Sequence, residues 1–327
     1  MPTADRPAAE PARAPAAAPP PEPAPAADPL AGSGVLVVDK PAGMTSHDVV
    51  ARVRRILGTR RVGHSGTLDP MATGVLVLGV GRGTRFLAHV HADAKAYAAT
   101  IRLGGATVTD DAEGEPLGGA PAGGLAEEAV RAAVAGLTGE LMQVPSAVSA
   151  VRVAGERAHA RVRRGEAVAI PARPVTVGRF EITALRRPGG PGGRWLDLDV
   201  AVECSAGTYV RALARDLGAA LGVGGHLTAL RRTAAGPFTL ADAVGLDELA
   251  ERGAPSLDLD AACLRCFPVR EVDAAQAAML AQGRWLEPVG RTGVHAALGP
   301  DGRVPALIEE SGRRARTVFV VRPATLG

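Results

Sequence analysis

Short apolar runs separated by turn residues dominate the chain. The runs at residues 35–38, 75–80 and 97–103 have the length and composition of strands. Residues 195–204 alternate apolar and polar positions, which is typical of an antiparallel strand with one buried face. A glycine- and proline-rich turn joins this strand to its expected partner at residues 175–185.

Apolar positions with helical spacing predict three helices in the same region. Residues 47–57 carry apolar side chains at helical intervals, Thr45 or Ser46 can cap this helix, and Gly58 ends it. The other two helices are expected at residues 125–137 and 208–221. Because strands and helices follow one another in irregular order, the pattern favours an α+β fold over a doubly wound sheet.

Composition divides the chain into three parts. The first 32 residues contain 12 alanines and 10 prolines, which leaves no apolar pattern to bury, so we expect a disordered tail. A second shift near Pro255 separates a large body at residues 33–255 from a small domain at residues 256–327. In the small domain we expect a helix at residues 273–282, followed by three short strands.

Bulk composition excludes several classes of protein. Hydrophobic residues make up 46% of the chain, enough for a sizeable core. No apolar run reaches the ~20 residues of a membrane helix, and the N-terminus lacks a secretory pattern. Three cysteines argue against a disulfide scaffold and fit a reducing, cytoplasmic location. Cys263 and Cys266 lack a second pair to complete a zinc site, and we expect Asp110–Gly114 to be an exposed turn rather than a cation site.

Positive charge is concentrated in one stretch of the body. Between His47 and Arg85 the chain has seven arginines and two aspartates. Such a patch suits a polyanion, although a solvated helix face in a chain with 35 arginines and two lysines is the alternative. The candidate residues for binding a nucleic acid are Arg52, Arg54, Arg55, Arg60 and Arg61.

The loop at residues 63–74 is the sharpest local feature. Three glycines surround Asp69, and Pro70 holds Asp69 in extended geometry that can present its carboxylate outward. Taken alone, the loop could be an ordinary turn in which Asp69 caps a backbone amide. A second segment, residues 204–211, ends a strand and opens a helix from which Arg211 could reach a carboxylate.

Together these segments resemble the TruB family of tRNA pseudouridine synthases. The family motifs are matched, in order, by DKPAGMTS at residues 39–46, GHSGTLDPMATG at 63–74 and CSAGTYVR at 204–211. Lys95-Ala96-Tyr97 and Leu230-Arg231-Arg232 fit two shorter patterns. Residues 143–152 depart from the family, since a proline, an aromatic residue and a lysine of its pattern are replaced.

The resemblance implies isomerisation of the uridine at position 55, in the T-arm loop of tRNA, to pseudouridine. The N1–C1′ bond breaks, the flipped base rotates, and C5 joins C1′. Asp69 is then the nucleophile or base, kept ionised by Arg211 within ~4–6 Å. Tyr97 lies against the base and is a candidate for removing the C5 proton. No water is activated, and no cofactor or metal is required.

The resemblance also implies supporting roles and an architecture. Tyr209 lines the pocket, Leu230 forms an apolar wall, Lys40 and Pro41 buttress the 63–74 loop, and His64 lies near the flipped nucleotide or fixes the loop by a hydrogen bond. The fold implied is the pseudouridine synthase fold, with a mixed, mainly antiparallel sheet flanked by helices. A small PUA-like RNA-binding domain follows, and we expect a monomer.

Two other classes of function remain open at this stage. An RNA-binding module without catalysis would share the basic patch but would not need Asp69 beside Arg211. A hydrolase acting on a nucleoside bond would need a partner that activates water, and the motif loops offer none.

Overall fold

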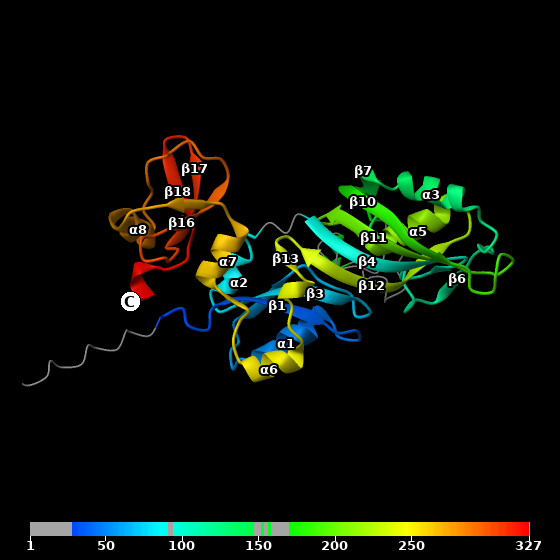
Figure 1. The fold of residues 1–327 in the computed structure, drawn as a ribbon, viewed down its shortest axis with the longest axis horizontal. Helices are drawn as coiled ribbons and strands as arrows, with labels where there is room; N and C mark the ends of the chain where they lie inside the picture. Colours follow the sequence, from blue (N-terminus) through cyan, green and yellow to red (C-terminus); the bar gives the residue numbers. More distant parts are fainter. Residues whose placement is uncertain (1–27, 91–93, 147–151, 154–155, 158–169, 327) are drawn as a thin grey trace, which may run out of the picture.

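A computed structural model of the chain describes residues 28–90, 94–146, 152–153, 156–157 and 170–326. Within them, a ten-stranded sheet forms a large body, and a four-stranded sheet forms a smaller part near the C-terminus (Figure 1). Residues 1–27 of the expected tail lie outside the described residues, as do residues 147–151 of the segment that departs from the family pattern. Residues 28–32 of that tail are described and pack on the body, since Leu30 is buried and Asp28 forms an ion pair with Arg322.

The body sheet takes strands from most of the chain. They are β1 (Gly34–Lys40), β2 (Val62–Ser65), β3 (Thr73–Val80), β4 (Ala94–Leu103), β7 (Gly139–Gln143), β10 (Arg173–Arg186), β11 (Leu196–Ser205), β12 (Gly225–Ala235), β13 (Phe238–Thr239) and β14 (Leu257–Asp258). Their order is β14-β1-β3-β12-β4-β11-β10-β7, with β2 beside β3 and β13 beside β12. Among these described strands only β12 and β3 pair in parallel, so the mixed, mainly antiparallel sheet is confirmed.

The helices and minor elements are short. The helices are α1 (Ser46–Ile56), α2 (Gly83–Phe86), α3 (Glu127–Ala135), α5 (Val210–Ala220), α6 (Leu246–Arg252), α7 (Leu259–Cys266) and α8 (Ala274–Ala281). The 3-10 turns are η1 (Leu240–Asp242) and η2 (Ala324–Leu326), and the two minor hairpins are β5 (Ala106–Thr107) with β6 (Pro116–Gly118) and β8 (Arg152–Val153) with β9 (Glu156–Arg157). None of the helices in the described part of the chain is long and apolar enough to cross a membrane.

Capping residues explain where the helices start. Thr45 accepts a hydrogen bond from the Asp48 amide and Asp48 accepts one from the Thr45 amide, a capping box that begins α1 close to the expected position. Helix α5 begins two residues later than residue 208, because Tyr209 occupies the N-cap. The Thr208 hydroxyl instead lies 3.3 Å from the Ser205 hydroxyl.

Two apolar clusters cover the two faces of the sheet. Leu36 and Val38 of β1 point into the larger cluster with α1, α3, α5 and α6, whereas Val35 and Val37 point into the other with Phe86 and α7. Every residue of β1 from Gly34 to Val38 is therefore buried, as in a strand covered on both sides. Figure 1 shows α1 and α6 below the sheet and α5 and α3 at its other end.

The second sheet packs on the Phe86 side of the body. It has the order β15-β16-β17-β18, from β15 (Val269–Glu271), β16 (Val294–Leu298), β17 (Ala306–Ser311) and β18 (Arg314–Val320). Its Phe319 joins the Phe86 cluster, and Arg82 donates hydrogen bonds to the carbonyls of Val320 and Val321. Strand β14 still belongs to the body sheet, so the second sheet starts later than the shift near Pro255.

The body sheet has a narrow seam where β12 meets β3. Only two residue pairs join them, Arg231 with Thr73 and Arg232 with Gly74. Gly74 has φ +97°, and a β-carbon there would lie 2.2 Å from the Arg232 carbonyl oxygen. Glycine is therefore required at this crossing, for conformation and for space.

Gly74→Ala is expected to lower the free energy of unfolding by about 3 kcal/mol or more, because strain and a backbone collision add. Gly222→Ala is the matched control, since Gly222 has φ +68° but a methyl group added there would meet nothing within 4 Å. It should cost about 1 kcal/mol. Urea unfolding of both variants measures the difference, and equal losses would show that the seam tolerates a side chain.

Candidate active site

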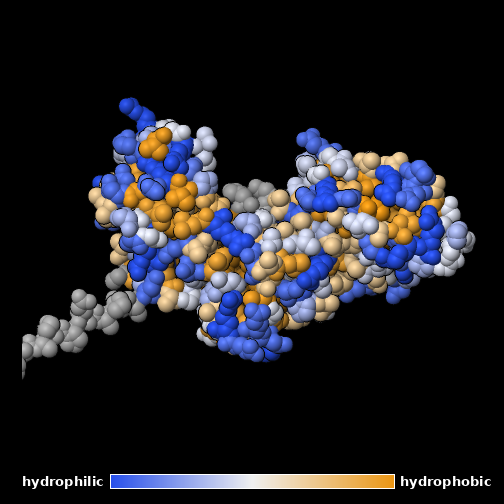
Figure 2. Space-filling model, in the orientation of Figure 1, coloured by the Kyte–Doolittle hydropathy of each residue, from blue (hydrophilic) through white to orange (hydrophobic). Residues whose placement is uncertain are grey.

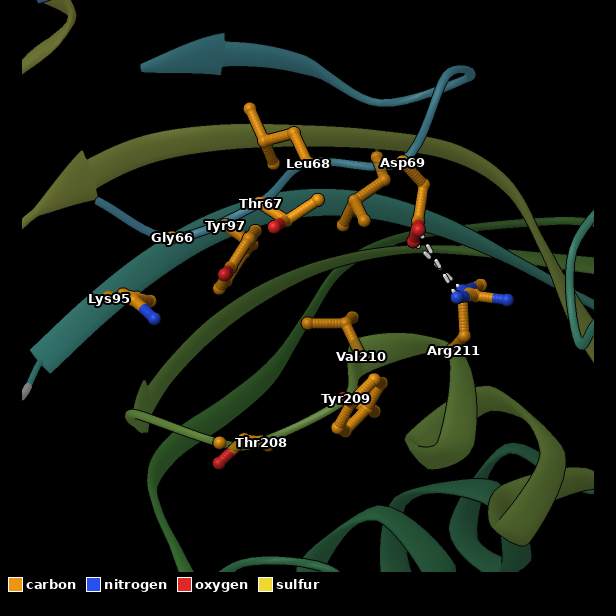
Figure 3. Close-up of a pocket in the computed structure, with 12 residues that line it drawn as sticks. Gly66, Thr67, Leu68, Asp69, Lys95, Tyr97, Thr208, Tyr209, Val210 and Arg211 are labelled. Carbon is orange, nitrogen blue, oxygen red and sulfur yellow. Dashed lines mark hydrogen bonds and ion pairs between the residues drawn. The ribbon is translucent and has the colours of Figure 1, made fainter. Parts of the chain in front are cut away.

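A cavity of about 230 Å³ opens beside the seam, where four segments meet. The 63–74 loop, the start of β4, the turn before α5, and β12 each contribute to it (Figure 3). Its lining residues are Gly66, Thr67, Leu68, Asp69, Lys95, Tyr97, Gly207, Thr208, Tyr209, Val210, Arg211 and Leu230. Five residues singled out from the sequence thus share one cavity: Asp69, Tyr97, Tyr209, Arg211 and Leu230.

Asp69 and Arg211 form the expected ion pair. Arg211 Nε lies 2.9 Å from Asp69 Oδ2, and Nη2 donates to Oδ1 at 3.2 Å. The Asp69 side chain is 36% exposed, whereas that of Arg211 is only 5% exposed. The guanidinium therefore holds the carboxylate from the protein side in a two-point contact, and the carboxylate remains accessible from the cavity.

A second carboxylate, that of Asp111, contacts Arg211 and lies outside the cavity lining. Asp111 Oδ2 lies 3.5 Å from Arg211 Nη1, which also donates to the Thr109 carbonyl at 2.7 Å. The Asp111 side chain is 5% exposed and Asp110 is also buried, so the expectation of an exposed turn at residues 110–114 was wrong for these two residues. Ala112 and Glu113 are exposed as expected. The turn is drawn inward because Arg211 and Arg215, one helical turn apart on α5, contact Asp111 and Asp110.

Asp110 shows how tightly this turn is held. It is the one non-glycine residue in the described chain with positive φ, at 60°. Burial raises the pKa of its carboxyl, although Arg215 lies 3.4 Å away. Two adjacent aspartates gave no sequence signal of this burial, since the arginines that contact them lie about a hundred residues further along the chain.

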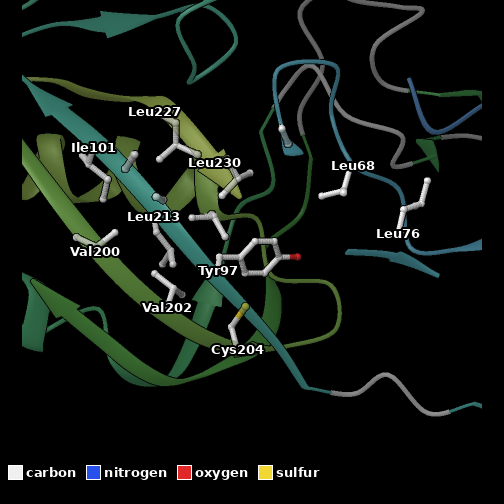
Figure 4. Close-up of a cluster of buried hydrophobic side chains, with 14 of the residues drawn as sticks. Leu68, Leu76, Tyr97, Ile101, Val200, Val202, Cys204, Leu213, Leu227 and Leu230 are labelled. Atoms are coloured by element: carbon white, nitrogen blue, oxygen red, sulfur yellow. The ribbon is translucent and has the colours of Figure 1, made fainter. Parts of the chain in front are cut away.

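Tyr97 has its ring in the larger apolar cluster and its hydroxyl at the edge of that cluster (Figure 4). Burial raises the pKa of the phenol, and the positive charge of Arg232 opposes that rise. The hydroxyl is thus protonated at neutral pH. Leu230, from the neighbouring strand, also lines the cavity and gives it a second apolar wall.

Lys40 fastens the segment before α1 to the 63–74 loop. Its buried Nζ donates to the carbonyls of Pro41, Met44 and Pro70, at 2.8, 2.6 and 3.2 Å. Burial lowers the pKa of Lys40, and the charge of Asp69 acts in the opposite direction. Lys40 and Pro41 thus lie beside the loop and outside the cavity lining.

Gln143, which the sequence did not indicate as a functional residue, fixes the Tyr209 backbone. Its amide oxygen accepts from Tyr209 N at 2.8 Å, and its amide nitrogen donates to Tyr209 O at 3.2 Å. Because Tyr209 is the N-cap of α5, this contact sets the start of the helix that carries Arg211. Gln143 is almost completely buried.

His64 lies on β2, outside the residues that line the cavity. Its ring meets that of His47 edge to face, with centroids 5.5 Å apart. The Nδ1 atom is buried and has no hydrogen-bond partner among the described residues. Burial lowers the pKa of His64, and the charges of His47 and Arg232 lower it further.

The five candidate RNA-binding arginines are all exposed, on α1 and the segment after it. Arg54 folds back and donates to the Val62 carbonyl at 2.8 Å. Figure 2 shows hydrophilic side chains gathered over the region of α6 and α1. The arrangement leaves Arg52, Arg55, Arg60 and Arg61 directed at solvent.

Solved structures with the same architecture define the class of protein. The crystal structure of an archaeal box H/ACA sRNP Nop10–Cbf5 complex matches with a TM-score of 0.66 and 25% identity, covering 91% of this chain and 88% of that chain. An H/ACA RNP bound to a substrate RNA containing 2′-deoxyuridine matches with the same TM-score at 23% identity. The fold is that of the pseudouridine synthases.

Family models and relatives narrow the class. The model "TruB family pseudouridylate synthase (N terminal domain)" matches residues 54–210, "tRNA pseudouridylate synthase B C-terminal domain" matches 211–265, and "tRNA Pseudouridine synthase II, C terminal" matches 267–322. Proteins named tRNA pseudouridine synthase B from Corynebacterium efficiens and Nocardia farcinica are 60% and 62% identical, covering 91% of this chain and 99% and 96% of theirs. The chain belongs to the TruB family.

Gln143→Leu is expected to lower the free energy of unfolding by about 2 kcal/mol. It removes the partner of the Tyr209 amide and one of the two donors to the Tyr209 carbonyl, which still accepts from Leu213 N. Gln276→Leu is the control, since its side chain accepts one exposed hydrogen bond, from Asp273 N. That loss should stay near or below about 1 kcal/mol. Thermal unfolding of the two variants compares them, and equal stabilities would refute the role assigned to Gln143.

Proposed function

We propose that the chain isomerises uridine 55, in the T-arm loop of tRNA, and that Asp69 is its catalytic carboxylate. Conversion of uridine to pseudouridine in tRNA is the activity of the family, and relatives that bear this name match nearly the whole chain. The observation that carries the assignment is the Asp69 carboxylate, open to the cavity and held by the buried Arg211. We propose a cytoplasmic, monomeric enzyme.

Arg211 supplies what the reaction requires of Asp69. A contacting guanidinium favours the ionised carboxylate and fixes its orientation toward the sugar and base of a flipped nucleotide. Three routes use such a group: attack at C1′, addition at C6, and elimination through a glycal. Attack uses an oxygen beside C1′, addition uses one beside C6, and elimination uses one that reaches the C2′ hydrogen. Each route needs one ionised oxygen in the cavity, and Asp69 supplies it.

The lining of the cavity argues against hydrolysis. Among the described residues, Asp69 supplies the single carboxylate of that lining, and Asp111 lies behind Arg211. A glycosidase-type mechanism needs a second carboxylate to activate water. The aromatic and aliphatic walls formed by Tyr97, Val210 and Leu230 instead exclude water, which protects the detached base.

The remaining site residues receive supporting roles in this proposal. Tyr97 stacks on the flipped uracil. Its phenol gives its own proton to N1 of the detached base and takes the C5 proton once C5 has joined C1′, so the proton lost from C5 is balanced by the one gained at N1. Tyr209 and Leu230 flank the base, and Lys40 and Pro41 hold the 63–74 loop. His64 contacts the RNA beside the flipped nucleotide, where its pKa, lowered by burial, keeps the ring neutral.

The proposed contacts with the RNA backbone lie outside the cavity. Arg52, Arg54, Arg55, Arg60 and Arg61 contact phosphates, mostly by shape and charge. We propose that the PUA-like C-terminal part adds a second contact. Its exposed Trp285 stacks with Arg314, whose guanidinium carbon is 4.7 Å from the ring centroid, and such pairs bind nucleic acid well.

Asp69→Asn is expected to abolish turnover and to leave tRNA binding within a few fold, because the amide keeps the shape of the side chain and loses its charge. Single-turnover assays with an unmodified tRNA transcript, followed by chemical mapping of pseudouridine, measure both the rate and the position. Asp199→Asn, in an ion pair on β11 outside the cavity, is the control. Retention of a tenth of wild-type activity by Asp69→Asn would exclude it as the catalytic carboxylate.

Replacing both Arg52 and Arg55 with alanine should weaken tRNA binding and flatten its salt dependence. Each lost phosphate contact removes roughly one unit from the slope of log affinity against log salt. The modified position should stay uridine 55, since the cavity selects the nucleotide. Arg131→Ala, on α3 and paired with Glu127, is the control. An unchanged slope would mean that these arginines do not contact the RNA, and new modified uridines would mean that they set the register.

A further inference from the structure

Arg232 is a buried cation that the mechanism above does not use. It is 1% exposed and is the largest fully buried side chain described. It lies on β12 at the seam, two residues after Leu230. Among the described residues no ion pair with a carboxylate is found for Arg232, so backbone oxygens stabilise its charge. Burying a charge without a counterion costs free energy, so the position of Arg232 needs a structural or functional explanation.

Its hydrogen bonds converge on the 63–74 loop and the residue after it. Nε donates to the Val75 carbonyl at 2.7 Å, and Nη2 donates to the Gly66 carbonyl at 3.1 Å. A longer contact of 3.5 Å joins Nη1 to the Thr67 carbonyl. The acceptors precede and follow Asp69, so a single planar group holds both ends of the loop that presents the carboxylate.

The same residue is the neighbour of Tyr97. In the register of the sheet, Arg232 lies opposite Tyr97 on β4 and opposite Gly74 on β3. The guanidinium also interacts with the phenol, whose pKa it lowers against the effect of burial. The Arg232 side chain therefore contacts both the 63–74 loop and the Tyr97 phenol, and it sets the distance between them.

We propose that Arg232 is a positioning residue that fixes the Asp69 loop and the Tyr97 hydroxyl relative to each other, so that both reach the same flipped nucleotide. This inference rests on the proposed function, in which Asp69 and Tyr97 act on one uridine. A lysine cannot replace it, because one ammonium group on a flexible stem cannot span acceptors on both ends of the loop.

Kinetics of Arg232→Lys test the proposal. We expect kcat to fall on the order of 100-fold while the KM for tRNA stays within threefold, since small displacements of reacting groups have that effect on rate. Arg82→Lys is the matched control, because Arg82 also donates to two backbone carbonyls, but at the C-terminal sheet. It should lower the melting temperature and leave kcat within twofold. A kcat within threefold of wild type for Arg232→Lys, or equal factors in kcat and tRNA affinity, would overturn the proposal.

A spectroscopic measurement tests the contact without requiring activity. Tyr97 and Tyr209 are the two tyrosines of the chain, so a Tyr209→Phe background labelled with 3-fluorotyrosine gives one fluorine resonance, from Tyr97. Adding Arg232→Met should move the ionisation midpoint of this resonance upward and change its chemical shift, and adding Arg82→Lys should not. An unmoved resonance contradicts the proposal. Absence of pseudouridine formation by the wild-type enzyme would instead refute the proposed function.

Discussion

The parallel join between β3 and β12 is the constraint on which the site depends. Two residue pairs form this join, and they bring the start of β3 beside β12, which lies more than 150 residues further along the chain. Gly74 permits the close approach, and Arg232 lies across it. The 63–74 loop, Tyr97 and Leu230 meet here because β12 pairs with β3 on one side and β4 on the other. The cavity is therefore a consequence of strand order.

Three buried cations contact the 63–74 loop, and they have two different roles. Lys40 and Arg232 donate to backbone carbonyls of the loop, so their charges stabilise its backbone conformation. Arg211 donates to the Asp69 carboxylate, so its charge acts on a group open to the cavity. Hydrogen bonds from a charged donor are stronger than neutral ones, which is why a loop with three glycines can be held in one conformation.

Local patterns in the sequence predicted β1, β3, β4, β10, β11 and α1 with its cap, and the family resemblance supplied the mixed sheet. They did not predict β2, β7 or β12. The motifs also indicated the contact between Asp69 and Arg211. The contributions of Gln143, Asp111 and Arg232 could not be predicted from periodicity, because their partners lie between 66 and 166 residues away along the chain. A buried polar side chain is defined by the groups it meets after folding, and residue type alone does not specify them.

The basic helix α1 and the loop that carries Asp69 are joined by short hydrogen bonds. Ser46, at the start of α1, accepts from the Leu68 amide at 2.9 Å and donates to the Leu68 carbonyl at 3.2 Å. The Gly43 amide donates to the Pro70 carbonyl at 2.9 Å, so the residues on both sides of Asp69 are bonded to the segment that leads into α1. In the proposed function, RNA bound by the arginines of α1 is positioned relative to the loop through these hydrogen bonds. The residues proposed to bind RNA backbone and the carboxylate proposed to react with the nucleotide are different residues. Because residues 43–46 connect α1 to the Asp69 loop, the position of the bound RNA and the position of Asp69 depend on each other.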